Sequence, residues 1–363
     1  MSIKYLYDRK KIAITYGEQK YSYADVIKYV NYYSEFLDIS KGDRVALMME
    51  NRPESIFSFF SIWAKKGIAL SLDAGYTVEQ LAYVLSDSTP KYIFISNKVK
   101  EVVEKANEKI GNIVKILVVD EISLPDNYIP KQEEYHNDSD EEVAIIVYTS
   151  GTTGNPKGVM ITYENIRANM DGITAANLVN DTDSILAMLP YHHIMPLCFT
   201  LILPMYLGVP VILLTEISSA SLLKTLQENV VTVILGVPRV WEMLDKAIMT
   251  KINENSLARF MFKMASKINS MSIRKMLFSK VHKQFGGHIR LMVSGGAKID
   301  KNILEDFRTM GFRAIQGYGM TETAPIITFN VPGRERSDSA GEVIPNVEVK
   351  IADDGEILVK GKN

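Results

Sequence analysis

Short apolar runs alternate with longer stretches of helical spacing along most of the chain. Residues 53–65 and 77–87 have apolar positions three and four residues apart, and Thr77 is a suitable helix N-cap. Strands that alternate with helices are typical of a parallel α/β sheet. The first half therefore predicts one such sheet, with strands at residues 45–49, 69–72, 92–95 and 113–119.

The second half of the chain repeats this pattern and then changes. Apolar runs predict the strands of a second sheet at residues 230–235, 289–293 and 312–315. Beyond residue 333, short alternating runs at 347–351 and 356–359 flank Asp353-Asp354-Gly355, which is typical of a β-hairpin. We therefore expect two α/β subdomains with mostly parallel sheets packed together, and then a small β subdomain. The expected bounds are residues 1–180, 181–330 and 331–363.

Two further segments need an explanation. Residues 253–284 form a basic amphipathic helical stretch with Met and Phe at apolar positions, and we interpret it as a solvated face over a core. Residues 194–215 carry no charge over a length that could cross a bilayer. Three prolines within that span argue against a spanning helix, because lipid cannot pair the carbonyls they release. A buried helix, a turn at 207–208 and a strand at 209–214 are expected instead.

Composition excludes several classes of protein. The chain has 363 residues, 41 basic and 43 acidic, so its net charge of −2 gives no general attraction to nucleic acid. Its single cysteine, Cys198, excludes an internal disulfide and a cysteine metal cluster, and apolar neighbours indicate a buried thiol. The first residues contain no apolar secretory segment. We expect a cytoplasmic protein without a transmembrane segment, and peripheral membrane contact stays open.

The stretch YTSGTTGNPKGVM, residues 148–160, follows an apolar run at 143–147 that predicts a buried strand. Glycines let backbone N–H groups approach phosphate oxygens, hydroxyls add donors, and a lysine adds positive charge. The spacing fits neither the common NTPase loop nor the dinucleotide motif. A surface turn is the alternative, but a turn does not require so many hydroxyls together with a lysine. The candidate phosphate-binding residues are Thr149, Ser150, Gly151, Thr152, Thr153, Gly154 and Lys157.

Glycines also follow three predicted strands of the second sheet, at Gly236, Gly295-Gly296 and Gly317. Ligands of open parallel sheets bind beyond the carboxyl ends of the strands, so these glycines predict one cleft. The last of them opens the stretch GYGMTETAP, in which Tyr318 lies between two glycines with its ring free to stack on a planar base. Glu322 offers a carboxylate beside hydroxyls, which suits Mg²⁺ when phosphate oxygens supply further ligands.

These two stretches resemble the motifs of the adenylate-forming superfamily, which includes acyl-CoA synthetases, luciferases and peptide-synthetase adenylation domains. The resemblance implies that the loop at 149–158 holds the β- and γ-phosphates of ATP. It also implies that Tyr318 stacks on adenine, Thr321 contacts the α-phosphate and Glu322 coordinates Mg²⁺. The turn at 294–297 matches the adenine-side turn of that family. The implied nucleotide contacts thus include Gly295, Gly296, Ala297, Gly317 and Gly319.

The resemblance extends over essentially the whole chain. The segment LPYHH aligns His193 with the histidine that lines the carboxylate and thiol entrance in that family, and His192 with its variable neighbour. Glu356 and Gly361 match a segment that is mainly structural. Ala74 stands where a proline is usual. No counterpart of the family's ribose-binding aspartate motif or of its C-terminal domain lies before residue 363, so we expect this chain to be deficient in the full reaction.

The implied reaction is ATP-dependent activation of a carboxylic acid to an acyl-adenylate, followed by thioester formation with coenzyme A. A carboxylate anion must approach the negatively charged α-phosphate of ATP. The reaction therefore needs this charge to be neutralised, by Lys157, by Mg²⁺ on Glu322 and by the donors of the loop. The sequences of residues 234–244 and 280–297 resemble those of long-chain fatty acid ligases. The alternatives are an acyl-carrier-protein ligase, an amino-acid adenylation domain, and a non-catalytic nucleotide- or acyl-binding module. The oligomeric state is not readable from the sequence.

Overall fold

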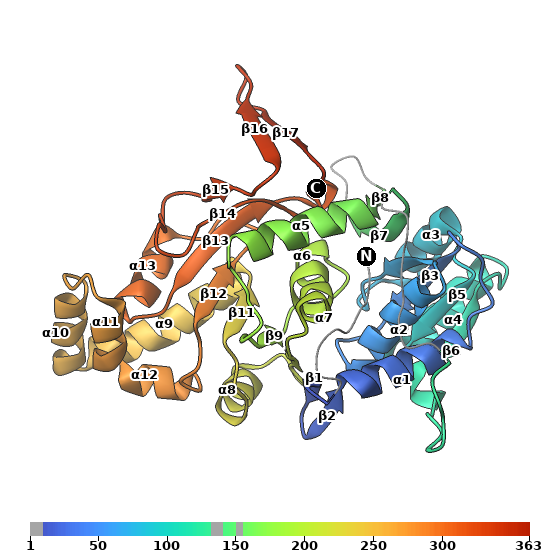
Figure 1. The fold of residues 1–363 in the computed structure, drawn as a ribbon, viewed down its shortest axis with the longest axis horizontal. Helices are drawn as coiled ribbons and strands as arrows, with labels where there is room; N and C mark the ends of the chain where they lie inside the picture. The colour runs from blue at the N-terminus through green and yellow to red at the C-terminus, as the bar shows by residue number, and fades with distance from the viewer. Residues whose placement is uncertain (1–9, 132–140, 150–154) are drawn as a thin grey trace. The chain divides into compact units, whose positions relative to one another are not determined.

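The computed structural model describes residues 10–131, 141–149 and 155–363 (Figure 1). The chain divides into two compact units. Unit 1 contains Met1–Arg167 and Pro190–Gly208, and unit 2 contains Ala168–Leu189 and Val209–Asn363. Each unit is built around a largely parallel sheet with helices, which confirms the predicted α/β class. The three-part division into residues 1–180, 181–330 and 331–363 stays a prediction.

The sheet of unit 1 has the strand order β6-β5-β3-β4-β7-β8. All neighbouring strands run parallel except β7 and β8, which are antiparallel. The predicted strands are confirmed, with ends that differ by one or two residues. The bounds are β3 (Arg44–Met48), β4 (Ile68–Ser71), β5 (Tyr92–Ile95), β6 (Lys115–Val118), β7 (Val143–Thr149) and β8 (Lys157–Thr162).

Helices cover both faces of this sheet because its strands are apolar on both sides. Ala46 and Met48 belong to a core with α3 (Val78–Ser88) and α4 (Lys100–Lys109), whereas Leu47 points to the side of α2 (Pro53–Ala64). On the α2 side, α1 (Tyr23–Ser34) packs on α2 through stacked rings of Tyr29 and Phe57, 4.4 Å apart. The predicted cap of α3 is confirmed, since the Thr77 hydroxyl accepts from the Gln80 amide.

The uncharged stretch after Pro190 folds as predicted. It forms a run of buried short helices, and a turn at Gly208, with φ of +68°, ends the run. The strand β10 follows in unit 2. Among the described residues, no helix combines the length and the apolar composition needed to cross a membrane. The bounds are α6 (Ile194–Pro196), the π-helix η3 (Leu197–Ile202), α7 (Leu203–Leu207) and β10 (Val211–Leu213).

Shorter elements complete unit 1. A hairpin of two antiparallel strands lies near the start of the described chain. One 3₁₀ turn directly precedes α4, and another directly follows β6. The buried thiol expected at Cys198 is confirmed, and burial raises its pKa. The bounds are β1 (Ile12–Tyr16), β2 (Gln19–Ser22), η1 (Asn97–Val99) and η2 (Val119–Glu121).

In unit 2 the strands follow the order β15-β14-β13-β12-β11-β9-β10. Strands β9 to β13 pair in parallel with one another, and β14 and β15 extend the sheet beyond β13 as antiparallel strands. The three predicted strands are confirmed and begin two or three residues later than expected. The bounds are β9 (Ile185–Ala187), β11 (Val233–Gly236), β12 (Leu291–Ser294), β13 (Ala314–Gly319), β14 (Ile326–Phe329) and β15 (Glu342–Val343).

The predicted hairpin after residue 333 is also confirmed. Strands β16 (Val347–Ile351) and β17 (Ile357–Gly361) pair in antiparallel register. The turn between them closes with a hydrogen bond of 2.9 Å from the amide of Gly355 to the carbonyl of Ala352. Gly355 has φ of +90°, a conformation that favours glycine.

An ion pair with a buried carboxylate connects the starts of three parallel strands in unit 2. Arg290, next to β12, donates from Nε to Oδ1 of Asp183 at 2.9 Å and from its NH2 group to the carbonyl of Leu178 at 2.8 Å. The hydroxyl of Thr232, which precedes β11, donates to the same carboxylate at 2.7 Å. Burial opposes the charged form, but hydrogen bonds from Arg290, Asn180 and Thr232 lower the pKa of Asp183. The amino ends of β9, β11 and β12 are therefore held together.

One core cluster packs helices against a face of the unit 2 sheet. It joins α8 (Ser219–Glu228), α9 (Pro238–Glu254) and α13 (Lys301–Thr309) to side chains from the strands. Trp241 is 2% exposed and meets Phe307 edge to face at 5.9 Å. Trp241 is therefore part of the core of unit 2.

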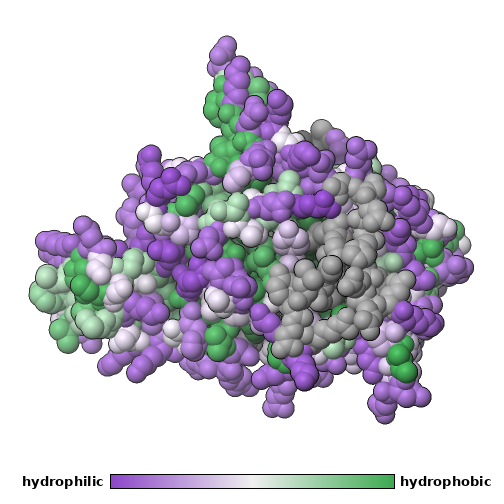
Figure 2. Space-filling view, in the orientation of Figure 1, coloured by the Kyte–Doolittle hydropathy of each residue, from purple (hydrophilic) through white to green (hydrophobic). Residues whose placement is uncertain are grey.

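The predicted helical stretch 253–284 is divided into separate helices. After α9 come α10 (Ser256–Ala265), α11 (Met271–Leu277) and α12 (Ser279–Gln284). Asn255 ends the first helix and caps the next, because its side chain accepts from two amides of α10 at 3.0 Å. Only part of the apolar surface faces the core, and Figure 2 shows green, apolar surface where α10 and α11 lie.

Two carboxyl groups lie where α9 packs on α13. Burial, with Asp306 and Asp300 nearby, raises the pKa of Asp245 from 3.8 to about 6. Burial and neighbouring carboxylates raise the pKa of Asp306 as well. Among the described residues, Oδ1 of Asp245 is buried without a hydrogen-bond partner. Ionisation at this contact therefore opposes folding.

The substitution Asp245→Asn should stabilise the protein at pH 7 but not below about pH 4. Because folding raises this pKa, the folded chain binds more protons between about pH 4 and 6, and stability falls as pH rises through that window. After discounting for solvent screening, we expect a gain of about 1–2 kcal/mol at pH 7. Thermal unfolding against pH measures it. Glu254→Gln, an exposed change on the same helix, is the control. Equal melting shifts at pH 4 and 7 would contradict the assignment.

Candidate functional site

In unit 2, three predicted glycine-bearing strand ends lie side by side. Gly236 of β11 pairs with Ser294 of β12, and Ser294 pairs with Gln316 of β13. The amide of Gly295 donates to the carbonyl of Gly236 at 3.2 Å. Because the strands are parallel, the turn after β12 and the GYGMTET stretch of β13 leave the same edge of the sheet. The predicted convergence of these segments is confirmed.

The glycines at this edge have a steric reason. A Cβ atom on Gly319 would lie 1.7 Å from the carbonyl oxygen of Pro325, so no other residue fits without moving the backbone. Gly296 has φ of +81°, which also favours glycine. Gly296 and Ala297 are exposed, whereas Gly295 is buried. The turn at 295–297 therefore leaves its backbone open, so that a planar base or a phosphate can approach it closely.

Tyr318 leaves this edge as an open aromatic ring. Its residue is 40% exposed although it belongs to β13, and it pairs with Thr328 of β14. The register shifts between Tyr318 and Gly319, so the strand bends directly after the ring. An exposed ring on a rigid strand is suited to stacking, because few conformations are lost on binding.

The next turn, η4 (Thr321–Thr323), presents Glu322 to solvent. Thr323 is buried and holds the turn: its hydroxyl bonds to the carbonyls of Met320 and Pro325 at 3.0 Å. Thr321 is half-buried beside the carboxylate. No group of three or more His, Cys, Asp or Glu side chains able to hold a metal occurs among the described residues. A single carboxylate fits Mg²⁺, which keeps several waters and takes phosphate oxygens as further ligands.

Asn169 supports this turn and was missed by the sequence analysis. It lies in α5 (Tyr163–Ala175), is fully buried, and donates from Nδ2 to the carbonyl of Thr323 at 3.2 Å. Its Oδ1 accepts from the amide of Ile326 at 2.8 Å. One side chain thus holds both ends of the segment after Glu322. A polar residue among the buried apolar positions Ile166, Met170 and Ile173 was the available signal.

Replacement of Asn169 by Ala should loosen the turn that carries Thr321 and Glu322. It leaves buried backbone groups without these partners, so we expect a loss of stability of about 1–3 kcal/mol together with weaker Mg-ATP binding. Denaturant unfolding and titration calorimetry measure the two effects. Asn229→Ala, which removes a hydrogen bond of 2.9 Å to Thr225 in α8, is the matched control and should leave nucleotide binding unchanged. Unchanged Mg-ATP affinity in a folded Asn169→Ala protein would rule out a positioning role.

In unit 1, the antiparallel strands β7 and β8 bring the two ends of the candidate phosphate loop together. Thr149 pairs with Lys157, and the Lys157 side chain is exposed. Ser150, Gly151, Thr152, Thr153 and Gly154 lie outside the described residues. A Cβ on Gly158 would lie 2.9 Å from Cγ2 of Ile146, so β8 approaches its neighbour closely here.

Helix α3 supports the base of this loop, which sequence reasoning did not foresee. Tyr83 donates its hydroxyl to the carbonyl of Pro156 at 3.4 Å. Tyr148, next to Thr149, donates its hydroxyl to the carboxylate of Asp87. Burial and this carboxylate raise the pKa of Tyr148, so its hydroxyl stays protonated and a donor.

His192 and His193 form a contacting pair in unit 1. Their Nε2 atoms lie 3.1 Å apart, and Nε2 of His192 lies 3.7 Å from Oδ2 of Asp73. Burial and the neighbouring His193 lower the pKa of His192 to about 4, although Asp73 opposes this. Burial also lowers the pKa of His193. Both rings are therefore neutral at pH 7, with one donating a hydrogen bond to the other, and His193 is the more exposed of the two.

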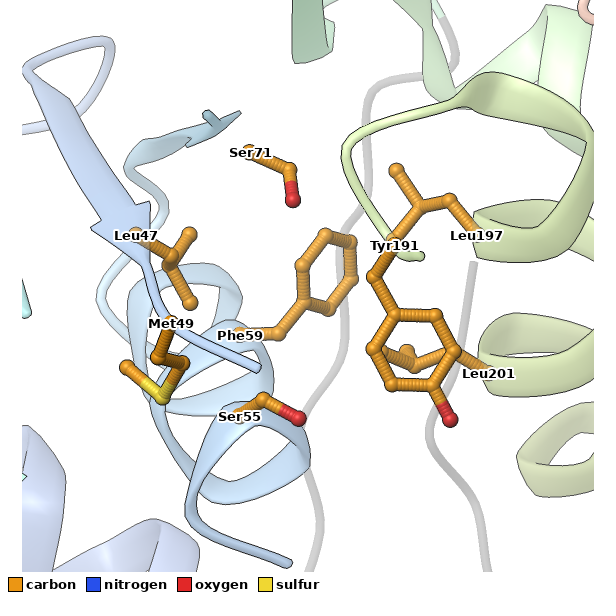
Figure 3. Close-up of a pocket in the computed structure, with 8 residues that line it drawn as sticks. All are labelled: Leu47, Met49, Ser55, Phe59, Ser71, Tyr191, Leu197 and Leu201. Atoms are coloured by element: carbon orange, nitrogen blue, oxygen red, sulfur yellow. The ribbon is translucent and has the colours of Figure 1, made fainter. Parts of the chain in front are cut away.

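A small pocket lies within unit 1, and its lining includes Tyr191, the residue before His192 (Figure 3). With its open mouth it contains about 270 Å³ of empty space. The part that the centre of a water molecule can reach is about 10 Å³, so the pocket holds roughly one water and does not accommodate an acyl chain as it stands. Its lining is mainly apolar, with two serine hydroxyls, and consists of Leu47, Met49, Ser55, Phe59, Ser71, Tyr191, Leu197 and Leu201.

Comparison with known proteins identifies a family. The model of the family described as AMP-binding enzyme matches residues 7–363. Human mitochondrial malonate–CoA ligase ACSF3 is 26% identical over 86% of this chain and 51% of its own length. A 2-succinylbenzoate–CoA ligase of Geobacillus sp. is 29% identical over 90% of this chain and 60% of its own length. A long-chain-fatty-acid–CoA ligase of Bacillus subtilis is 24% identical over 97% and 66%. The chain thus spans about half to two thirds of these relatives.

Solved structures show the same fold. Apo MatB from Rhodopseudomonas palustris matches 99% of this chain and 68% of its own, with a TM-score of 0.78 and 23% identity. The O-succinylbenzoate coenzyme A synthetase MenE of Bacillus subtilis in complex with AMP matches 98% and 68%, with a TM-score of 0.75 and 25% identity.

Proposed function

We propose that this chain, which belongs to the family of AMP-binding enzymes, binds ATP and a carboxylic acid and serves the formation of an acyl-adenylate. The observation that carries this proposal is that the ends of the parallel strands β12 and β13 lie side by side. There, a glycine turn, an exposed tyrosine ring and an exposed carboxylate leave one edge of a parallel sheet. Such an edge is where open α/β sheets bind ligands.

The proposed contacts of unit 2 follow from what each group offers. The ring of Tyr318 stacks on adenine, next to the backbone edge of Gly295, Gly296 and Ala297. Gly317 and Gly319 permit the close approach. The Thr321 hydroxyl donates to the α-phosphate, and the Glu322 carboxylate holds Mg²⁺. A bound Mg²⁺ ion supplies positive charge against the phosphate oxygens. A relative with this fold, MenE from Bacillus subtilis, has been solved with ATP and magnesium.

In unit 1 we propose that Lys157 and the loop from Thr149 to Gly154 hold the β- and γ-phosphates. Solvent screens the exposed ammonium of Lys157, so it acts only on groups nearby. Its position opposite Thr149, at the base of the loop, places it close enough to contact phosphates held there. The neutral histidine pair is proposed to line the entrance for the acid and the thiol. A neutral His193 can donate or accept one hydrogen bond without placing a cation in the site.

The proposed reaction needs no protein nucleophile. A carboxylate oxygen attacks the α-phosphorus, a new oxygen–phosphorus bond forms, and the bond to the β-phosphate breaks to release pyrophosphate. The sulfur of a thiol, coenzyme A in this proposal, then attacks the acyl carbon, gives up its proton and displaces AMP. The protein's part is to align anions and neutralise their charge. Because the chain spans part of its relatives' length, the complete reaction stays a proposal for the whole protein.

Lys157→Ala and Glu322→Ala should each weaken Mg-ATP binding by roughly 10- to 100-fold, the loss expected for one charged contact. Both side chains are exposed, so the folded state should survive the changes. Titration calorimetry with this chain measures the affinity, and Lys98→Ala, an exposed lysine elsewhere, is the control. If both variants bind Mg-ATP as the parent does, the assignment of these two residues is wrong.

For the acid, we propose a long-chain fatty acid. Support comes from residues 234–244 and 280–297, which resemble that class, and from the Bacillus subtilis long-chain-fatty-acid–CoA ligase, which matches nearly the whole chain. Relatives that act on malonate and on 2-succinylbenzoate have similar identity, so they favour a second candidate, a small dicarboxylic or aromatic acid. An acyl-carrier protein is the alternative acceptor to coenzyme A.

ATP–pyrophosphate exchange should be fastest with long-chain fatty acids when malonate, 2-succinylbenzoate, amino acids and fatty acids of several lengths are compared. The assay uses this chain together with any longer product of the same gene, and a Lys157→Ala protein provides the background. Faster exchange with malonate or 2-succinylbenzoate would replace the fatty acid proposal without affecting the nucleotide site. Absence of exchange with every acid, despite Mg-ATP binding, would favour a non-catalytic binding module.

A further inference from the structure

We propose that helices α10 and α11 form a docking surface for an anionic lipid bilayer. This α10–α11 surface lies entirely in unit 2. It does not depend on the proposed function, because it concerns neither the nucleotide nor the acid. Its exposed apolar side chains are Leu257, Phe260, Met264, Ile273 and Met276.

Helix α10 carries two apolar stripes, and the core uses only one. Ala258, Phe262 and Ala265 belong to or pack against the core cluster of unit 2. Leu257, Phe260 and Met264 follow one another at intervals of three and four residues, so they form a second stripe on another face. Their exposed fractions are 65%, 62% and 48%. A helix that is apolar all round is normally buried, so the second stripe requires an explanation.

Helix α11 extends the same surface. It contacts α10, and its residues Ile273 and Met276 are 44% and 67% exposed. Single exposed apolar residues are ordinary, but five within twenty positions on contacting helices mark an interaction site. Figure 2 shows this as green surface beside purple at the end of unit 2 that α10 and α11 form.

The charged side chains of residues 255–284 have one sign, and the exposed carboxylate of Glu254 lies directly before them. Residues 255–284 contain seven Lys or Arg and no Asp or Glu, in a chain of net charge −2. Arg274 has a structural task, because it donates to the carbonyls of Ile268 and Arg308 at 2.6 and 3.1 Å. The other six are exposed and have no ion pair with any carboxylate that the structure describes. They are Arg259, Lys263, Lys267, Lys275, Lys280 and Lys283.

The combination of apolar side chains and cations favours a bilayer over other occupants. On α10, Lys263 lies about 60° and Arg259 about 100° around the helix from Phe260, on its polar side. Their long side chains can reach lipid phosphates while Phe260 enters the acyl boundary. A second copy of this surface would place like charges face to face. Single-stranded nucleic acid would stack on aromatic rings, but Phe260 is the sole aromatic side chain among the five.

Cosedimentation with vesicles tests the proposal. The parent chain should bind vesicles of equal parts phosphatidylcholine and phosphatidylglycerol, and should not bind phosphatidylcholine alone. Added salt should weaken binding, because it screens the lysines from the lipid charge. Equal binding to both vesicle types, or binding to neither, would overturn the proposal. A bound acidic protein would then be the remaining occupant.

Two pairs of variants separate the apolar from the charged contribution. Leu257→Ser with Phe260→Ser should lower partitioning at least about tenfold, because two apolar side chains no longer enter the lipid. The matched control is Ile129→Ser with Ile217→Ser, two positions that are each 80% exposed elsewhere. Lys263→Glu with Lys267→Glu should abolish the preference for anionic vesicles. Lys20→Glu with Lys98→Glu changes the net charge equally at other exposed positions and should not.

A depth measurement and a mass measurement complete the test. In a Phe260→Trp protein, lipids brominated on their acyl chains should quench the new fluorescence, whereas an Ile217→Trp protein should not be quenched. The two native tryptophans are buried and serve as the common background. Lack of quenching at position 260 overturns insertion. If light scattering instead finds a dimer that Leu257→Ser with Phe260→Ser dissociates, the surface is an interface between copies and the proposal is wrong.

Discussion

The parallel register of β11, β12 and β13 is the constraint on which the candidate site of unit 2 depends. Pairing of Gly236 with Ser294, and of Ser294 with Gln316, brings the turn after β12 and the GYGMTET stretch to one edge. At the opposite ends of the strands, the buried carboxylate of Asp183 is hydrogen-bonded by Arg290 and Thr232. A slip by one residue would turn every strand side chain to the other face, so the register and the core are specified together.

Rigid support is the common feature of the candidate groups. Asn169 holds the turn that carries Glu322, and Thr323 closes it from within. In unit 1, hydrogen bonds of Tyr83 and Tyr148 connect the base of the phosphate loop to helix α3. Groups held in this manner lose little freedom when a ligand binds. The neutral state of His192 has the same origin, since burial among fixed neighbours lowers its pKa.

Much of the fold was predictable because the local sequence pattern agrees with the tertiary packing of the same segments. The strand at residues 92–95 and the Thr77 cap were predicted at the observed positions. Strands β11 and β12 begin later than predicted, since an apolar run does not show where pairing starts. The stretch 253–284 was predicted as helical, but the prediction did not show that Asn255 and Ser270 cap separate helices there. Asn169, Tyr83 and Asp87 were missed because their partners lie far away in sequence.

By itself the sequence determined the class of fold and the kind of chemistry, because glycines, hydroxyls, a lysine and a carboxylate in YTSGTTGNPKG and GYGMTE suit phosphate and magnesium. It could not determine which side chains support these motifs, or that α10 keeps a second apolar stripe outside the core. Only the tertiary structure decided these points. Hydrogen bonds such as those of Asn169 and the burial of each helix face depend on segments that meet after folding, and such contacts leave no local pattern.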